Sequence, residues 1–132
     1  MGFKLVKYNN GRDNVGPFTS YEAASNEEIK AGEALVLTAG KLTKCGSTTA
    51  PQFISMTNLA KADTNRLIHV NKVNEDQVWR VACTSDPTAL KPGDKVTLSD
   101  DALMLTATTT SGVATVEQID EAEKELLVRL KS

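Results

Sequence analysis

Short apolar runs, separated by residues that break regular structure, most constrain what this chain can fold into. Gly, Pro, Asn and Asp interrupt the sequence before any run reaches the length of a long helix. The runs are rich in β-branched residues, with 15 threonines and 11 valines among 132 residues, and such residues favour strands. The sequence therefore predicts an all-β fold, a small barrel or sandwich of short antiparallel strands and hairpins.

The alternation of apolar and polar residues places the strands along the chain. Strands are predicted at residues 3–8, 34–38, 41–45, 52–56, 66–70, 77–83, 95–98, 103–107 and 112–119. Ala39 and Gly40 predict a tight hairpin between the second and third of these strands. Residues 18–30 contain helix formers but are too short and polar to form an isolated helix, so their structure stays open.

The C-terminal segment fits two patterns. Residues 119–130 carry apolar side chains at near-helical spacing, whereas residues 126–131 alternate as a strand does. We favour the strand, because the rest of the chain consists of hairpins, and residues 120–124 then form a turn.

The chain length suits one domain. Residues 1–30 are predicted to form an N-terminal strand and an extended polar arm, because residues 9–17 are rich in Asn, Gly and Asp. Residues 31–132 are predicted to form a compact β domain.

A short motif occurs twice. Residues 30–38 and residues 91–99 both read Lys, any residue, Gly, an acid, and then an alternating apolar segment that ends in a hydroxyl residue. A glycine in this position is typical of a turn that requires a positive φ. The repeat predicts two similar entries into strands.

The charge and the hydropathy pattern exclude several classes of function. The formal net charge is −2 and the pI is about 5.4, whereas nucleic acids and anionic membranes attract basic surfaces. No apolar run approaches the ~20 residues of a membrane span. The first residues, 1–7, have charges within the apolar stretch and no signal-peptide cleavage site, so we expect synthesis in the cytoplasm.

No constellation of residues predicts catalysis, a cofactor or a metal site. His69 is the only histidine, and nothing near it in the sequence supplies a partner for general base catalysis. Cys45 and Cys83 are too far apart for short-spaced metal motifs, and we expect both to be reduced and packed as small apolar residues. Asp100 and Asp101 lack the spacing of a calcium loop and are expected in a solvated turn.

An acidic run lies near the C-terminus. It comprises Glu117, Asp120, Glu121, Glu123 and Glu125, with Lys124, Arg129 and Lys131 partly balancing it. Such a run is usually a solvated face, although acidic turns also dock to basic partners.

Two parts of the chain resemble a known family. Residues 31–44 and 51–56, together with residues 90–101 running into 106–116, are similar to the capsid decoration and head-fibre-like proteins of tailed bacteriophages. The resemblance covers approximately residues 30–130 and rests on turn and strand patterns. It implies a small β-barrel-like module that binds the outside of the phage head.

The resemblance implies a structural virion protein that decorates or stabilises the capsid and has no enzymatic activity. The implied partner is the major capsid protein, and a homotrimer at a three-fold axis is the most natural oligomer. Addition of a strand to a neighbouring subunit would dock the N-terminal segment, which gives candidate capsid contacts at Phe3, Leu5, Tyr8, Asn10 and Arg12. The alternative is a fibre, tail or surface module that binds a carbohydrate or a protein receptor, in which Trp79, Tyr8 or Tyr21 would be exposed.

Overall fold

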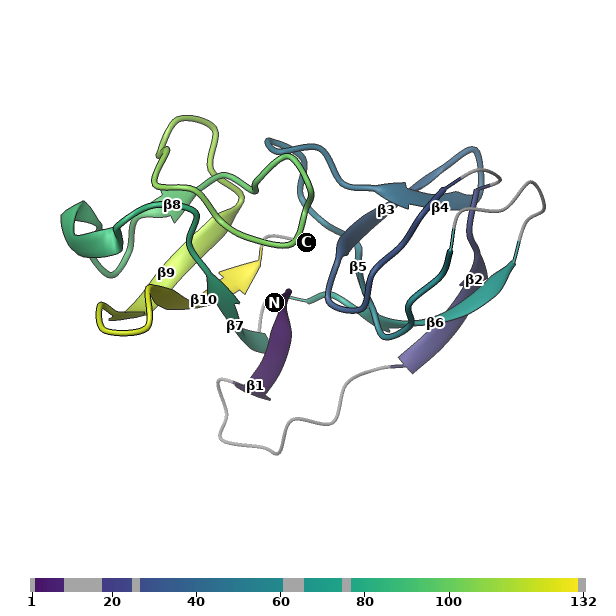
Figure 1. Cartoon of the computed structure of the whole chain (residues 1–132), viewed down its shortest axis with the longest axis horizontal. Helices are drawn as coiled ribbons and strands as arrows, with labels where there is room; N and C mark the ends of the chain where they lie inside the picture. Colours follow the sequence, from purple (N-terminus) through teal and green to yellow (C-terminus); the bar gives the residue numbers. More distant parts are fainter. Residues whose placement is uncertain (1, 9–17, 25–26, 61–65, 75–76, 131–132) are drawn as a thin grey trace.

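The computed structural model describes residues 2–8, 18–24, 27–60, 66–74 and 77–130. Within these residues the chain forms two five-stranded antiparallel sheets that lie side by side (Figure 1). The regular helical structure in this part is one 3₁₀ turn, Pro87–Ala89, and no helix there is long and apolar enough to cross a membrane. The predicted all-β fold is confirmed.

The first sheet, called the main sheet, has the strand order β1-β7-β10-β9-β8. Its strands are β1 (Lys4–Tyr8), β7 (Gln77–Ala82), β8 (Lys95–Val96), β9 (Ala114–Asp120) and β10 (Glu125–Leu130). The C-terminal segment is therefore a strand, as favoured above, because alternate residues Leu126, Val128 and Leu130 are buried in the core beneath the sheet. A helix would scatter these side chains around its axis.

The second sheet has the order β2-β6-β5-β3-β4. Its strands are β2 (Phe18–Glu22), β3 (Ala34–Thr38), β4 (Lys41–Lys44), β5 (Phe53–Ser55) and β6 (Leu67–Lys72). The chain just beyond β2 bridges to β4 at Ala23 and Leu42, and the Ala24 N–H donates to the Leu42 carbonyl at 3.0 Å. The sheet thus closes on itself, and we call it the barrel.

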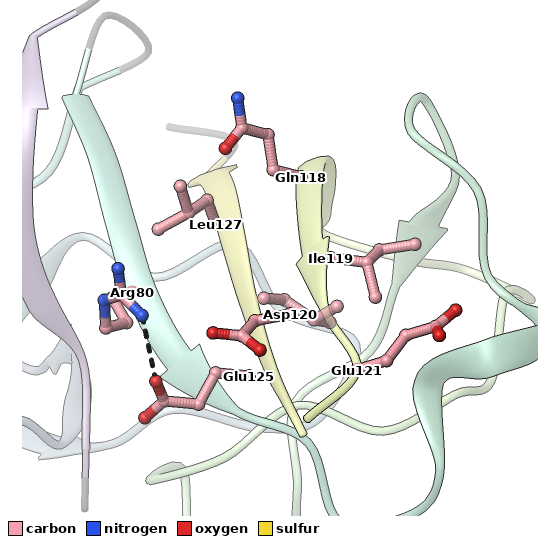
Figure 2. A pocket seen from close by; sticks show the side chains of 8 residues that line it. Arg80, Gln118, Ile119, Asp120, Glu121, Glu125 and Leu127 are labelled. Atoms are coloured by element: carbon pink, nitrogen blue, oxygen red, sulfur yellow. Dashed lines mark hydrogen bonds and ion pairs between the residues drawn. The ribbon is translucent and has the colours of Figure 1, made fainter. Parts of the chain in front are cut away.

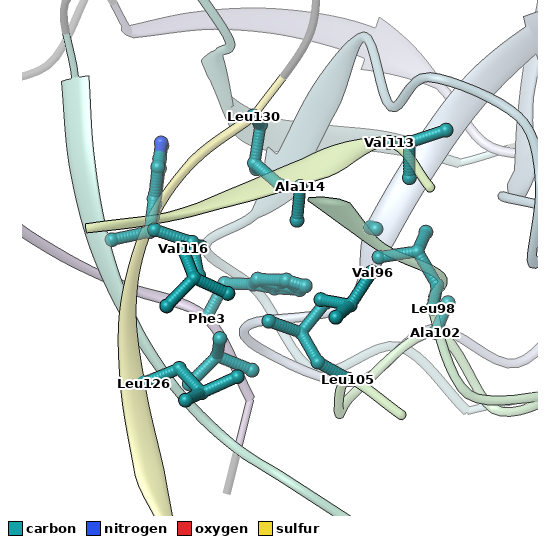
Figure 3. Packing of buried hydrophobic residues seen from close by; sticks show 14 of the residues in the cluster. Phe3, Val96, Leu98, Ala102, Leu105, Val113, Ala114, Val116, Leu126 and Leu130 are labelled. Carbon is teal, nitrogen blue, oxygen red and sulfur yellow. The ribbon is translucent and has the colours of Figure 1, made fainter. Parts of the chain in front are cut away.

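The described residues form two hydrophobic clusters, and β3 and β5 separate them. Ala34 of β3 and Ile54 of β5 face the main core, which lies beneath the main sheet and includes Trp79. Figure 3 shows other members of this core, among them Phe3 and Leu126. The barrel core consists of Ala23, Ile29, Leu35, Leu42, Phe53, Ile68 and Val70. Because successive side chains point to opposite faces of a strand, β3 contributes to both clusters. This double burial explains its unbroken apolar sequence.

Both copies of the repeated motif form the same turn. The Glu33 N–H donates to the Lys30 carbonyl and the Asp94 N–H donates to the Lys91 carbonyl, each at 3.0 Å. The two glycines between them have φ of +88° and +98°, which is the conformation that a type II turn requires at its third residue. Strands β3 and β8 begin directly after the acid of each turn, so the predicted strand entries are confirmed.

Three predicted segments differ from the structure. Residues 103–107 do not form a strand: Leu105 makes single-residue bridges to Cys83 and Leu98, because Ala102, at φ +57°, turns the chain just before this segment. The predicted strand at 95–98 shortens to β8. Residues 18–22 form β2, so this part of the expected N-terminal arm is an integral strand, while residues 9–17 lie outside the described residues.

Candidate functional site

Two of the five predicted contact residues, Phe3 and Leu5, have side chains in the described part of the chain. The Phe3 side chain is 4% exposed and belongs to the main core, and Leu5 packs against that core from β1. Phe3 therefore serves the internal packing of this chain, and the set of capsid contacts stays a prediction. Tyr8 ends β1, where its backbone is paired with Gln77; its side chain, Asn10 and Arg12 lie outside the described residues.

A polar hollow of about 440 Å³ lies instead on the outer face of the main sheet (Figure 2). Three neighbouring strands build it, because Leu127 of β10 stands opposite Arg80 of β7 and Gln118 of β9. The acidic tip of the β9–β10 hairpin, Asp120 and Glu121, forms one end of the hollow. Arg80 and Leu127 point outward because their neighbours along the strands are buried in the main core, namely Trp79, Val81, Leu126 and Val128.

Ion pairs set the charge pattern of this face. Arg80 Nη1 donates to Glu125 Oε1 at 3.0 Å across the β7–β10 pair, and Arg129 pairs with Glu117 across the β10–β9 pair. The Asp120 carboxylate accepts from the Glu123 N–H at 3.2 Å and shapes the hairpin tip. Both ion pairs are partly exposed, and such pairs contribute little to stability. Their donors and acceptors therefore remain accessible to a partner.

The sequence indicates the acidic residues of this site but not the residues that lie beside them. The acidic run, which the sequence predicts to be a solvated face, lies on the outer surface of β9, β10 and their hairpin. Arg80 lies 45 residues from Glu125, so their pairing depends on the register of β7 against β10. The alternation within residues 77–83 places Arg80 on the face opposite Trp79 and Val81, but it does not identify the strand that lies beside Arg80.

A second outer face belongs to the barrel. Leu67 and Met56 are 67% and 48% exposed, and the Met56 N–H donates to the His69 carbonyl at 3.1 Å. His69 itself faces solvent, with Nδ1 lying 2.8 Å from Ser20 Oγ. This barrel face carries two large apolar side chains around the histidine.

The cysteines and the histidine do not form a catalytic pair in the described structure. Cys45 and Cys83 are buried free thiols, as expected, whereas His69 is exposed. The Cys45 thiol donates to the Thr49 carbonyl at 3.0 Å, and burial raises the pKa of this thiol to about 12. A thiol that stays protonated is a poor nucleophile.

The acidic turn at residues 99–101 is satisfied by the protein itself. The Ser99 hydroxyl and the Leu103 N–H both donate to Asp101 Oδ1, and the Ser99 hydrogen bond lowers the pKa of the Asp101 carboxyl. Among the described residues, no cluster of three or more His, Cys, Asp or Glu side chains is arranged to hold a metal ion.

The described tryptophan and tyrosine side chains do not offer an exposed stacking platform. Trp79 is 1% exposed in the main core. The Tyr21 ring is partly buried and packs against Phe53 with ring centroids 4.9 Å apart. Sugar binding commonly uses exposed aromatic rings, so the burial of Trp79 weighs against the carbohydrate alternative.

The geometry defines a two-part all-β module with a polar sheet face and a barrel face that exposes Met56 and Leu67. No protein-family model matches this sequence, and no curated protein sequence matches it either. The crystal structure of the head fibre gp8.5 N base of bacteriophage phi29 is similar, with a TM-score of 0.59 and 14% sequence identity. The similarity covers 86% of this chain and 94% of that chain, and it establishes a shared fold.

Proposed function

We propose that this chain is a structural protein of a tailed-phage virion and binds the outer surface of the capsid. The observation that carries the proposal is the fold shared with a head fibre base over most of both chains. The major capsid protein is the proposed partner, and a symmetric oligomer, most simply a trimer, is the proposed form on the shell.

The polar hollow supplies the contact surface in this proposal. Its centre is the half-buried Leu127, and Arg80, Gln118 and Glu125 surround it with donors and acceptors. An apolar centre with a polar rim is the usual anatomy of a non-obligate protein interface. The surrounding charges of both signs would orient the docked partner and exclude surfaces with the wrong charge pattern.

The test is co-sedimentation of the purified full chain with capsids of its own phage over a range of salt concentrations. Saturable binding, at a copy number that fits the symmetry of the shell, is the expected result. If the protein stays at the top of the gradient at every salt concentration, the proposed function is wrong.

Two matched variants test the contact surface. Gln118→Arg adds a long cation to the hollow, and Leu67→Arg adds the same side chain to the barrel face; both positions are exposed on strands. We expect Gln118→Arg to weaken capsid binding at least tenfold, about 1.4 kcal/mol, and Leu67→Arg to leave it unchanged. The reverse result would assign docking to the barrel face.

A further inference from the structure

Glu33 occupies the joint between the barrel and the main sheet. Next to it, the Phe3 N–H donates to the Gly32 carbonyl at 2.9 Å, and the Ala34 N–H donates to the Ala102 carbonyl at 2.9 Å. The Glu33 carbonyl itself accepts from the Ser55 N–H at 2.9 Å. Residues 32–34 therefore bond to the residue that precedes β1, to the loop before Leu105 and to β5.

The carboxyl of Glu33 is enclosed at this joint. The residue is 4% exposed, and its Oε2 has no hydrogen-bond partner among the described residues. Its Oε1 accepts from the Lys30 N–H at 3.4 Å, which is a long hydrogen bond. A charged carboxylate that is buried with so few donors is unfavourable, whereas the protonated form avoids most of the desolvation penalty.

The same turn elsewhere in the chain gives an internal comparison. Asp94 takes the place of Glu33 in the second copy of the motif, and its Oδ2 accepts from the Lys91 N–H at 2.9 Å. This aspartate is partly exposed. The same turn therefore forms with an acidic side chain that is accessible to water, so the geometry of the turn does not require Glu33 to be buried.

The backbone of the turn that carries Glu33 is closely packed against the N-terminal segment. A Cβ placed on Gly32 would lie 2.9 Å from the Gly2 Cα, so the N-terminal segment and the turn are in direct backbone contact. Opening of this contact would expose the turn that carries Glu33 to water.

We propose that Glu33 makes this joint responsive to protons: the joint is closed while the carboxyl carries its proton, and it loosens when the proton is lost. The joint is defined by the bonds from Phe3 to Gly32 and from Ala34 to Ala102. The inference concerns the isolated chain and does not depend on capsid binding.

Burial, modified by the charges around the carboxyl, sets the pH at which Glu33 loses its proton. Burial raises the pKa of Glu33 from 4.5 to about 7. The Lys30 N–H lowers this pKa, the Glu27 carboxylate raises it, and the Lys44 and Lys30 ammonium groups lower it. Asp101, next to Ala102 on the other side of the joint, is also influenced by Lys30.

The direction of the pH effect follows from the raised pKa. When the joint opens, Glu33 regains its ordinary pKa and releases its proton more readily, so the closed form binds more protons between pH 4.5 and about 7. The closed joint is therefore fully stable below 4.5 and loses stability as the pH rises through about 7. The difference between these pKa values corresponds to a loss of up to about 300-fold in the closing equilibrium.

The test is amide hydrogen exchange of Phe3 and Ala34 in the full chain, followed by NMR between about pH 5.5 and about pH 8.5 and corrected for intrinsic exchange rates. We expect protection of both amides to fall by at least tenfold over this range in the native protein. Glu33→Gln should hold protection constant, and the matched control Asp94→Asn should retain the native pH dependence.

The same pH dependence in Glu33→Gln and the native protein would overturn the inference, as would constant protection in the native protein. If Glu33→Gln does not fold, the native protein still decides the question through NMR titration of the Glu33 side-chain carboxyl carbon. A midpoint near 7, coincident with the loss of protection, supports the proposal. A midpoint near 4.5 refutes it.

Discussion

Gly112 is the position where one added methyl group should most disturb the main sheet. A Cβ at this residue would lie 2.3 Å from the backbone C and O of Lys95 and 2.6 Å from the Val96 N. These atoms belong to β8, which pairs with β9 through Lys95–Thr115 and Val96–Ala114. Gly112→Ala therefore forces β8 and the loop before β9 apart.

The magnitude follows from what β8 contributes. Overpacking of a well-packed site usually costs about 1–3 kcal/mol. Val96 is 0% exposed in the main core, and loss of its burial would add about 1.5–3 kcal/mol. We expect Gly112→Ala to lower the free energy of unfolding by about 3 kcal/mol, a large part of the 5–15 kcal/mol that is typical of a domain.

The assay is equilibrium unfolding in urea, with Gly40→Ala as the matched control. Gly40 has φ of +80° and open space where a Cβ would lie, so alanine there carries only the backbone penalty of about 1–2 kcal/mol. If Gly112→Ala destabilises the protein no more than Gly40→Ala does, the contact between residue 112 and β8 is not as tight as the geometry requires.

Three further predictions concern the main core and its neighbours. Leu126→Ala, at a fully buried position of β10, should lower the free energy of unfolding by about 3 kcal/mol. Leu67→Ala, at a 67% exposed position, should change it by less than about 0.5 kcal/mol. Equal effects of the two variants in urea unfolding would contradict the burial pattern. Cys45 and Cys83 should not react with a thiol reagent at neutral pH until denaturant is added, and a rapid reaction in the folded state would show that the thiols are accessible. Trp79 fluorescence should shift to longer wavelength on unfolding, and an emission that is already at the solvent-exposed wavelength in the folded state would place the ring at the surface.

Local patterns were sufficient to predict the elements that depend on neighbouring residues in the sequence. The hairpin of β3 and β4 follows from two apolar segments joined by Ala39 and Gly40, which have φ of +51° and +80°. The two glycine turns were also predictable from the sequence, because the positive φ of the glycine and the acid that follows it involve only adjacent residues.

Elements that depend on distant partners were not predictable in this way. Strand β2 has a polar sequence and forms because β6 lies beside it over its whole length. Residues 103–107 alternate as a strand does, yet the Leu105 N–H donates to the Ala82 carbonyl and the Thr106 N–H to the Thr97 carbonyl, so two different neighbours share the segment. The polar hollow was missed for the same reason, since its residues meet only through the register of β7, β10 and β9.

The position of β3 between two cores has a consequence for how this sequence can change in evolution. A one-residue insertion or deletion inside a strand moves every later side chain to the opposite face. In most strands of the main sheet, such a shift would move core side chains into solvent. In β3 it would instead turn Leu35 and Leu37 toward the main core, and Ala34 and Val36 toward the barrel core. Length variation among related sequences should therefore gather in the loops and avoid β3, where point substitutions that conserve side-chain volume are the changes that both cores can accept.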